Sequence, residues 1–193
     1  MKNNSVLGVA EFHKAVLTGT YPKKCLRQFN SWNKKVEWCN EMGIRIMIKD
    51  VIFQGAKHEK ALVPIYSEDL GDHYRVFFKC KKGASKVDKL LKLIGFIDNI
   101  GPLWLGNLWN NDLLKKLTII PKVIQEESKI NTIGYYDIHK LFKGVKASIP
   151  KSEKIIEQIK KEGYEASRTH FTPYGIKSNI SKEKLKEVIK KLI

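Results

Sequence analysis

The pattern of apolar and polar positions predicts a strand and a long helix in the first part of the chain. Residues 5–12 form a short apolar run, which is typical of a buried strand. Residues 34–56 predict a helix whose second half is apolar all round, so that half should be well buried. Gly43 interrupts this helix and indicates close packing against a neighbour.

The next apolar runs predict an antiparallel strand pair followed by a helix. Residues 61–66 and 74–79 are the two β-like runs, and the segment between them contains Gly71. Residues 82–93 then predict a basic amphipathic helix with Gly95 as its C-cap, and we expect a domain boundary near its start.

Residues 99–106, NIGPLWLG, combine apolar side chains with glycine and proline. The Gly-Pro step predicts a turn, and the further glycine allows close backbone approach. Either a rigid bracket near a ligand or a packing loop between domains would have this composition. The residues expected to define this structural loop are Gly101, Pro102, Trp104 and Gly106.

After this loop the pattern predicts mainly helices. Residues 112–117 and 120–127 are expected as helix pieces divided at a proline, and residues 135–142 as a short helix. A connector over 144–149 leads to a helix over 150–162, which Gly163 should end at the C′ position.

The segment 164–178, YEASRTHFTPYGIKS, predicts two short extended runs joined by a Thr-Pro-Tyr-Gly turn. Proline presets φ for the second turn position, and we expect Gly175 to supply a positive φ. Ser181 then caps a last helix over 182–192. Helix, turn, helix, hairpin and helix together resemble a winged-helix arrangement.

Charge favours a polyanionic partner. The chain has a formal net charge of +16 and a pI of about 9.7. From residue 143 onward, 13 Lys and Arg stand against 6 Asp and Glu, a difference of +7. RNA or DNA therefore ranks ahead of an anionic membrane, although solvated lysines without a partner would give the same balance.

The spacing of the cysteines and the hydropathy of the chain indicate its cellular compartment and bear on whether it contains disulfides, a zinc site or a membrane span. Cys25, Cys39 and Cys80 are odd in number and lack CxxC spacing, which argues against a disulfide framework and a zinc site and fits a reducing cytoplasm. No apolar run reaches the length of a membrane span, and no signal-peptide core follows the start. We expect a soluble cytoplasmic protein without a bound metal.

Catalytic motifs are absent from the sequence. It contains no GxGxxG, Walker loop, GxSxG or HExxH, and its five histidines are dispersed. His170 stands beside Arg168 and suits a backbone or phosphate contact, or a packed ring, better than a general base. These residues alone indicate a basic nucleic-acid-binding protein.

Four segments also resemble one enzyme family. YEASRTHFTPYGIKS, GPLWLG, TGTYPKKCLR and CNEMGIRI are similar to the C-terminal half of tRNA (guanine-26-N2)-dimethyltransferases, which transfer methyl groups from S-adenosylmethionine. The segments occur in the family's order and span nearly the whole chain. The residues that this resemblance and their charge assign to tRNA are Lys23, Lys24, Arg27, Arg168, His170 and Lys177.

The resemblance implies an α+β architecture in two parts. Residues 1–82 are expected to be the end of a Rossmann-like methyltransferase domain, and residues 83–193 a helix-rich, tRNA-binding C-terminal domain with the winged-helix-like hairpin. The family's glycine-rich cofactor segment and its catalytic Asp-Pro-Phe-Gly have no counterpart here. We therefore expect neither catalytic nor cofactor-binding residues, and no binding of S-adenosylmethionine by this chain alone.

Three hypotheses follow from this comparison. The first is a tRNA-holding portion of the methyltransferase that needs a companion polypeptide carrying the missing half. The alternative is a non-catalytic winged-helix nucleic-acid-binding protein. The third is a decayed fragment without function.

Overall fold

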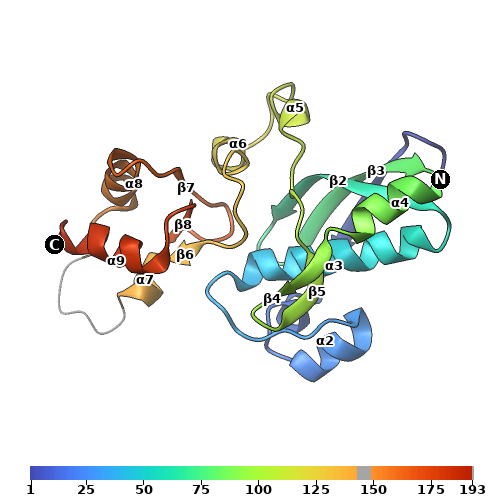
Figure 1. Cartoon of the computed structure of the whole chain (residues 1–193), viewed down its shortest axis with the longest axis horizontal. Coiled ribbons are helices and arrows are strands. Elements are labelled where there is room, and N and C mark those ends of the chain that lie inside the picture. The colour runs from blue at the N-terminus through green and yellow to red at the C-terminus, as the bar shows by residue number, and fades with distance from the viewer. Residues whose placement is uncertain (143–148, 193) are drawn as a thin grey trace. The chain divides into compact units, whose positions relative to one another are not determined.

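A computed structural model describes residues 1–142 and 149–192 of the 193-residue chain (Figure 1). The chain divides into two compact units, Met1–Leu113 and Leu114–Ile193, and each is considered by itself below. The predicted connector over 144–149 falls almost wholly outside the described residues. Both units mix short helices with small antiparallel sheets.

The first unit is built around one three-stranded sheet and one long helix. Its elements in chain order are β1 (Val6–Glu11), α1 (Lys14–Leu17), α2 (Pro22–Phe29), α3 (Cys39–Ala56), β2 (Lys60–Asp69), β3 (Tyr74–Lys82), α4 (Ala84–Leu91), β4 (Ile94–Ile97) and β5 (Ile100–Trp104). A short helix, α5 (Asn111–Leu114), lies at the boundary between the units.

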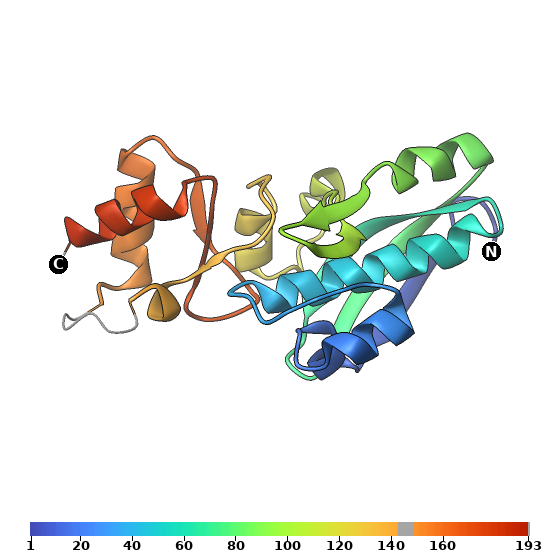
Figure 2. The same ribbon diagram turned by 60° about the horizontal axis from the view of Figure 1, so that its bottom comes forward.

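The sheet has the order β1-β3-β2, and both of its strand pairs are antiparallel. The predicted pair over 61–66 and 74–79 is confirmed, with longer strands and a shorter loop. The predicted strand over residues 5–12 is confirmed as β1, but its expected burial is wrong, because β1 lies at an edge and alternates exposed with half-buried positions. Its neighbour β3 is buried at every second residue, because one face of the sheet is covered by α3 (Figure 2).

Helix α3 begins at Cys39, later than the predicted start at residue 34. Gly43 of this helix lies against the sheet. A Cβ added at Gly43 would lie 2.6 Å from the hydroxyl oxygen of Tyr74 and 2.8 Å from the nearest atom of its ring. The close packing expected at Gly43 is therefore confirmed.

The segment after β3 stays within the first unit. Gly95 lies in β4 and pairs with Leu103, so it does not cap α4. That helix ends at Leu91, and Lys92 is its C-cap. Gly101 and Pro102 likewise lie within strand β5. The compact units divide after residue 113, and the expected domain boundary after residue 82 stays a prediction.

The second unit combines a small sheet with two amphipathic helices. Its elements are α6 (Lys122–Glu127), β6 (Tyr136–Asp137), α7 (Ile138–Leu141), α8 (Ser152–Lys161), β7 (Ala166–Arg168), β8 (Gly175–Ser178) and α9 (Lys182–Lys190). Isoleucine, leucine and valine from the helices and strands form its core, including Ile155, Ile159, Ile176, Leu185 and Val188. The predicted helix over 135–142 is partly wrong, since its start pairs as β6 with β8.

The predicted hairpin of residues 164–178 is confirmed, but Gly175 is needed for a different reason than the expected positive φ. The amide of Gly175 donates to the carbonyl of Thr172 at 3.2 Å, which closes the turn. Gly175 has no positive φ; a Cβ there would lie 2.4 Å from Cγ2 of Thr169, so close approach explains the glycine. Gly163 does adopt the expected left-handed φ of 89° after α8, and the Ser181 side chain caps α9.

Candidate nucleic-acid interface

The first group of predicted contact residues lies on α2. Pro22 occupies the start of this helix, where a missing N–H costs nothing. Cys25 and Phe29 anchor the helix in the core, while Lys23, Lys24 and Arg27 are exposed. The structure therefore presents all three cations on one short element, available to a polyanion.

The chain after α2 fastens this helix to β5. Trp32 and Gly101 exchange two backbone hydrogen bonds, of 2.7 and 2.8 Å. The Ser31 hydroxyl donates to the carbonyl of Pro102 at 2.8 Å. The residues that directly follow α2 are thus neighbours of the motif GPLWLG, which lies about 70 positions later in the chain.

A buried arginine on α3 supports the other end of GPLWLG. Arg45 is 3% exposed; its Nη1 donates to the carbonyls of Trp104 at 2.9 Å and Gly106 at 2.8 Å. Its Nε and Nη2 donate to Oε1 of the fully buried Glu41, at 2.9 and 2.8 Å. A Cβ on Gly106 would collide with the Trp104 ring at 2.3 Å. The loop is therefore a rigid part of the first unit; a contact with a ligand stays a prediction.

A buried lysine supports α2 from the same helix. The Lys49 ammonium donates to the carbonyl of Phe29, the last residue of α2. Burial lowers the pKa of Lys49, partly opposed by Asp50, and raises the pKa of Cys25 to about 11. Neither Arg45 nor Lys49 was singled out by sequence, because the main-chain carbonyls that they bind lie 20 or more residues away in the chain.

The second group of predicted residues lies on the hairpin, and of these three only Arg168 is exposed. The Arg168 side chain is 49% exposed and forms an ion pair with Glu153 at the start of α8. The pKa of Glu153 is lowered by a hydrogen bond from its own backbone and by the charge of Arg168. This pair is exposed, so a phosphate can compete with Glu153 for the guanidinium.

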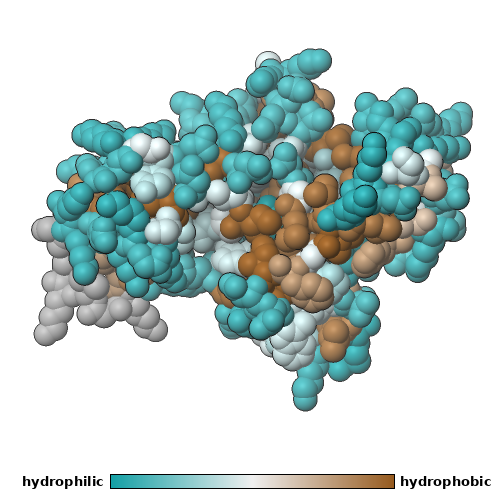
Figure 3. Space-filling view, in the orientation of Figure 1, coloured by the Kyte–Doolittle hydropathy of each residue, from teal (hydrophilic) through white to brown (hydrophobic). Residues whose placement is uncertain are grey.

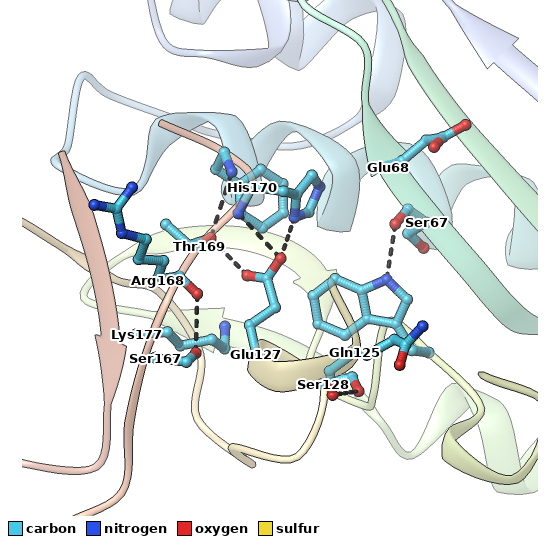
Figure 4. Close-up of polar contacts among 12 residues, drawn as sticks. Ser67, Glu68, Gln125, Glu127, Ser128, Ser167, Arg168, Thr169, His170 and Lys177 are labelled. Carbon is cyan, nitrogen blue, oxygen red and sulfur yellow. Dashed lines mark hydrogen bonds and ion pairs between the residues drawn. The ribbon is translucent and has the colours of Figure 1, made fainter. Parts of the chain in front are cut away.

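His170 belongs to a buried carboxylate network (Figure 4). Its backbone N–H donates to Oε1 of Glu127 at 3.1 Å, and its ring Nδ1 donates to the same oxygen. The Thr169 hydroxyl donates to Oε2 at 2.6 Å. Glu127 is fully buried, and the His170 side chain is 7% exposed. Of the roles considered for His170, the packed ring fits best, and Glu127 is a partner that the sequence did not reveal.

Lys177 does not present its charge on the surface. It is 1% exposed, and its ammonium donates to the carbonyl of Gly134 at 3.3 Å. The cause is the position of β8 between β6 and β7, which leaves all four of its residues buried. The expected phosphate contact of Lys177 is therefore corrected to a structural role.

Within residues 1–142 and 149–192, no group of three or more His, Cys, Asp or Glu side chains is placed to hold a metal ion. In the same ranges, no helix has the length and apolar character needed to cross a bilayer.

Comparison with known proteins decides the family. The family described as N2,N2-dimethylguanosine tRNA methyltransferase matches residues 1–100 and 96–190. The chain belongs to this family. A curated relative, the tRNA (guanine(26)-N(2))-dimethyltransferase of Methanobrevibacter smithii, is 31% identical over 99% of the chain and 61% of its own length. The tRNA (guanine(26)-N(2)/guanine(27)-N(2))-dimethyltransferase of Aquifex aeolicus is also 31% identical, over 100% of the chain and 58% of its own length.

One solved structure matches nearly the whole chain. Trm1 from Pyrococcus horikoshii, in complex with S-adenosyl-L-methionine, superposes with a TM-score of 0.84 and 28% sequence identity. The match covers 96% of this chain and 59% of that chain. The chain thus spans about three fifths of the length of the family members that it matches.

Nucleotide and cofactor sites in open α/β sheets lie beyond the carboxyl ends of parallel strands, commonly at a glycine-rich turn. The described strands of the first unit pair only in antiparallel fashion, and the sequence carries no GxGxxG. No step of methyl transfer is therefore assigned to residues of this chain.

Proposed function

We propose that this chain is the tRNA-holding portion of a guanine-26 N2-methyltransferase, and that methyl transfer requires a further polypeptide segment carrying the donor site and the catalytic carboxylate. The observation that carries the proposal is the family match over both units, together with a match that covers only about three fifths of each relative. The first unit would be the end of the Rossmann-like domain, and the second a winged-helix-like tRNA-binding domain.

The edge strand β1 supports a shared sheet. It pairs with β3 on one side and lies at the end of the order β1-β3-β2. Val6 is 57% exposed there, and an apolar edge strand is a natural place for another strand to add. A segment with the donor site would extend the sheet at β1, and S-adenosylmethionine would bind to that segment.

Methyl transfer tests the proposal directly. The chain is co-expressed with a segment that carries the family's glycine-rich turn and Asp-Pro-Phe-Gly, and methylation of tRNA guanine 26 is measured. We expect transfer only when both polypeptides are present. Methyl transfer by the chain alone, or micromolar binding of S-adenosylmethionine in a calorimetric titration of the chain alone, would overturn the division of labour.

Binding of tRNA is tested with two matched pairs of lysines. Lys23→Ala/Lys24→Ala removes two exposed charges from α2, whereas Lys86→Ala/Lys89→Ala removes two exposed charges from α4. We expect the α2 variant to bind tRNA more weakly. The slope of log K against log salt should become shallower by about 1–2, because fewer phosphate contacts form and fewer counterions are released on binding. Equal slopes for both variants would refute the role of α2. A wild-type chain that binds tRNA but gains no activity with the companion segment would favour the non-catalytic binder.

A further inference from the structure

The second unit contains a groove beside the hairpin tip. Its volume is about 660 Å³, within the range of roughly 300–1,000 Å³ that is usual for ligand pockets. Its apolar part is formed by Ile138, Ile149, Pro150 and Pro173. Apolar, ring-bearing walls of this kind suit a flat ligand with apolar faces.

Two aromatic rings stand at the rim of this groove. The centroids of His139 and Tyr174 are 4.0 Å apart, and their planes are tilted by 40°. Tyr174 is 49% exposed, and His139 is exposed as well. The amide of Ile138 donates to the carbonyl of Tyr174 at 3.1 Å, which fixes the hairpin tip against α7. The rings are therefore held in place while a face remains open to solvent.

Charged side chains border the same space. Lys151, Arg168 and Glu153 line the groove, and the last two form the ion pair described above. Two cations and one carboxylate leave the border positive, in a part of the chain with a difference of +7. An anionic group placed at Arg168 would replace Glu153 as its partner.

We propose that this groove is a subsite for one unpaired nucleotide of RNA, whose base stacks on Tyr174 and His139 and whose phosphate binds Arg168. This inference rests on the proposed function. It adds which part of the second unit contacts the RNA, and that the nucleotide bound there is unpaired. Proteins commonly hold single-stranded bases on aromatic side chains with cations along the backbone. A paired base cannot enter, since its faces are covered by its neighbours in the stack.

The test uses the full chain and two RNA hairpins that differ by one bulged nucleotide. The bulged position carries 2-aminopurine, whose emission falls when it stacks on an aromatic ring. We expect the wild type to bind the bulged RNA more tightly and to quench the probe. Tyr174→Ala should weaken binding of the bulged RNA by about 5- to 150-fold and abolish the quenching, because one base stack is worth that much. Tyr174→Phe keeps the ring and should behave as the wild type.

Two further variants separate the groove from general effects. Phe96→Ala removes another exposed aromatic ring, 64% exposed on β4, and should change neither the affinity nor the quenching. Glu153→Gln should tighten binding by up to about 5-fold, since it frees Arg168 and removes a repelling carboxylate. This gain would not arise from damage to the fold.

The outcomes distinguish the two proposals. If the chain binds both RNAs and Tyr174→Ala matches the wild type in affinity and quenching, the groove is not a nucleotide subsite, and the proposed function stands. If the wild type binds neither these hairpins nor tRNA, the proposed function falls, and the groove assignment falls with it.

Discussion

Replacing Arg45 by methionine gives the sharpest test of how the first unit is held together. The change removes four hydrogen bonds, two to Glu41 and two to the carbonyls of Trp104 and Gly106. Breaking a buried ion pair by removing one partner costs about 3–5 kcal/mol, because the remaining charge stays buried. At about 4 °C per kcal/mol for a domain of this size, the midpoint of thermal unfolding should fall by about 12–20 °C.

Tryptophan fluorescence makes this measurement specific to one unit. All four tryptophans lie between residues 32 and 109, within Met1–Leu113. Thermal and urea unfolding followed by their emission therefore report the first unit. The matched control is Arg75→Met, since Arg75 is 46% exposed and 3.9 Å from Glu68; it should cost less than about 1 kcal/mol.

A second substitution separates the buried charge from the lost packing. Glu41→Gln in the Arg45→Met background removes the uncompensated carboxylate, so the double variant should be more stable than Arg45→Met alone. The reasoning is refuted if Arg45→Met lies within 1 kcal/mol of the wild type, or if the second substitution destabilises the unit further.

Three other predictions concern packing and ionisation. Glu127→Gln should lower the stability of the second unit by about 1–3 kcal/mol, seen by circular dichroism, because the three hydrogen bonds of the buried carboxylate no longer all find an acceptor. Gly43→Ala should destabilise the first unit by about 1–2 kcal/mol in urea, since overpacking against Tyr74 exceeds the gain in helix propensity. The lowered pKa of Lys49 means that the unfolded chain binds more protons, so stability should rise with pH from the folded-state pKa toward 10.5. Lys49→Met should lose that rise.

These predictions have their own controls and contrary outcomes. Glu126→Gln changes a neighbouring carboxylate that is 46% exposed and should leave the second unit unchanged. Equal effects of the two glutamine variants would contradict the role given to Glu127. A Gly43→Ala protein as stable as the wild type would show that Tyr74 moves aside. Parallel pH profiles for the wild type and Lys49→Met would contradict the assigned ionisation.

Local sequence patterns predicted most elements of the fold because those elements depend on neighbouring residues. The turn before Gly175, the cap at Ser181 and the end of α8 at Gly163 each involve contacts within a few positions. The resemblance to the methyltransferase family could be recognised from four short segments, and the family is confirmed.

The buried charges could not be predicted, since their environment is set by distant parts of the chain. Lys177 was expected to face solvent because the hairpin was considered as two strands. The missed strand β6 makes β8 the central strand and buries Lys177. Glu127 is hidden in the same way, as its partners Thr169 and His170 lie more than 40 residues later.

The positions of these charges change what the hairpin can do with RNA. Lys177 and His170 hold the interior of the second unit, so their charge or hydrogen-bonding capacity is already used. What remains accessible is at one end, where Arg168 and Tyr174 meet the start of α8. A short contact of this kind cannot grip a long duplex by itself, but it can select a base that has left its stack. Such a base is what chemistry on a guanine amino group requires, because a stacked base cannot be reached. Under the proposed function, the groove would hold a neighbouring nucleotide unstacked, and α2 would bind phosphates of the tRNA.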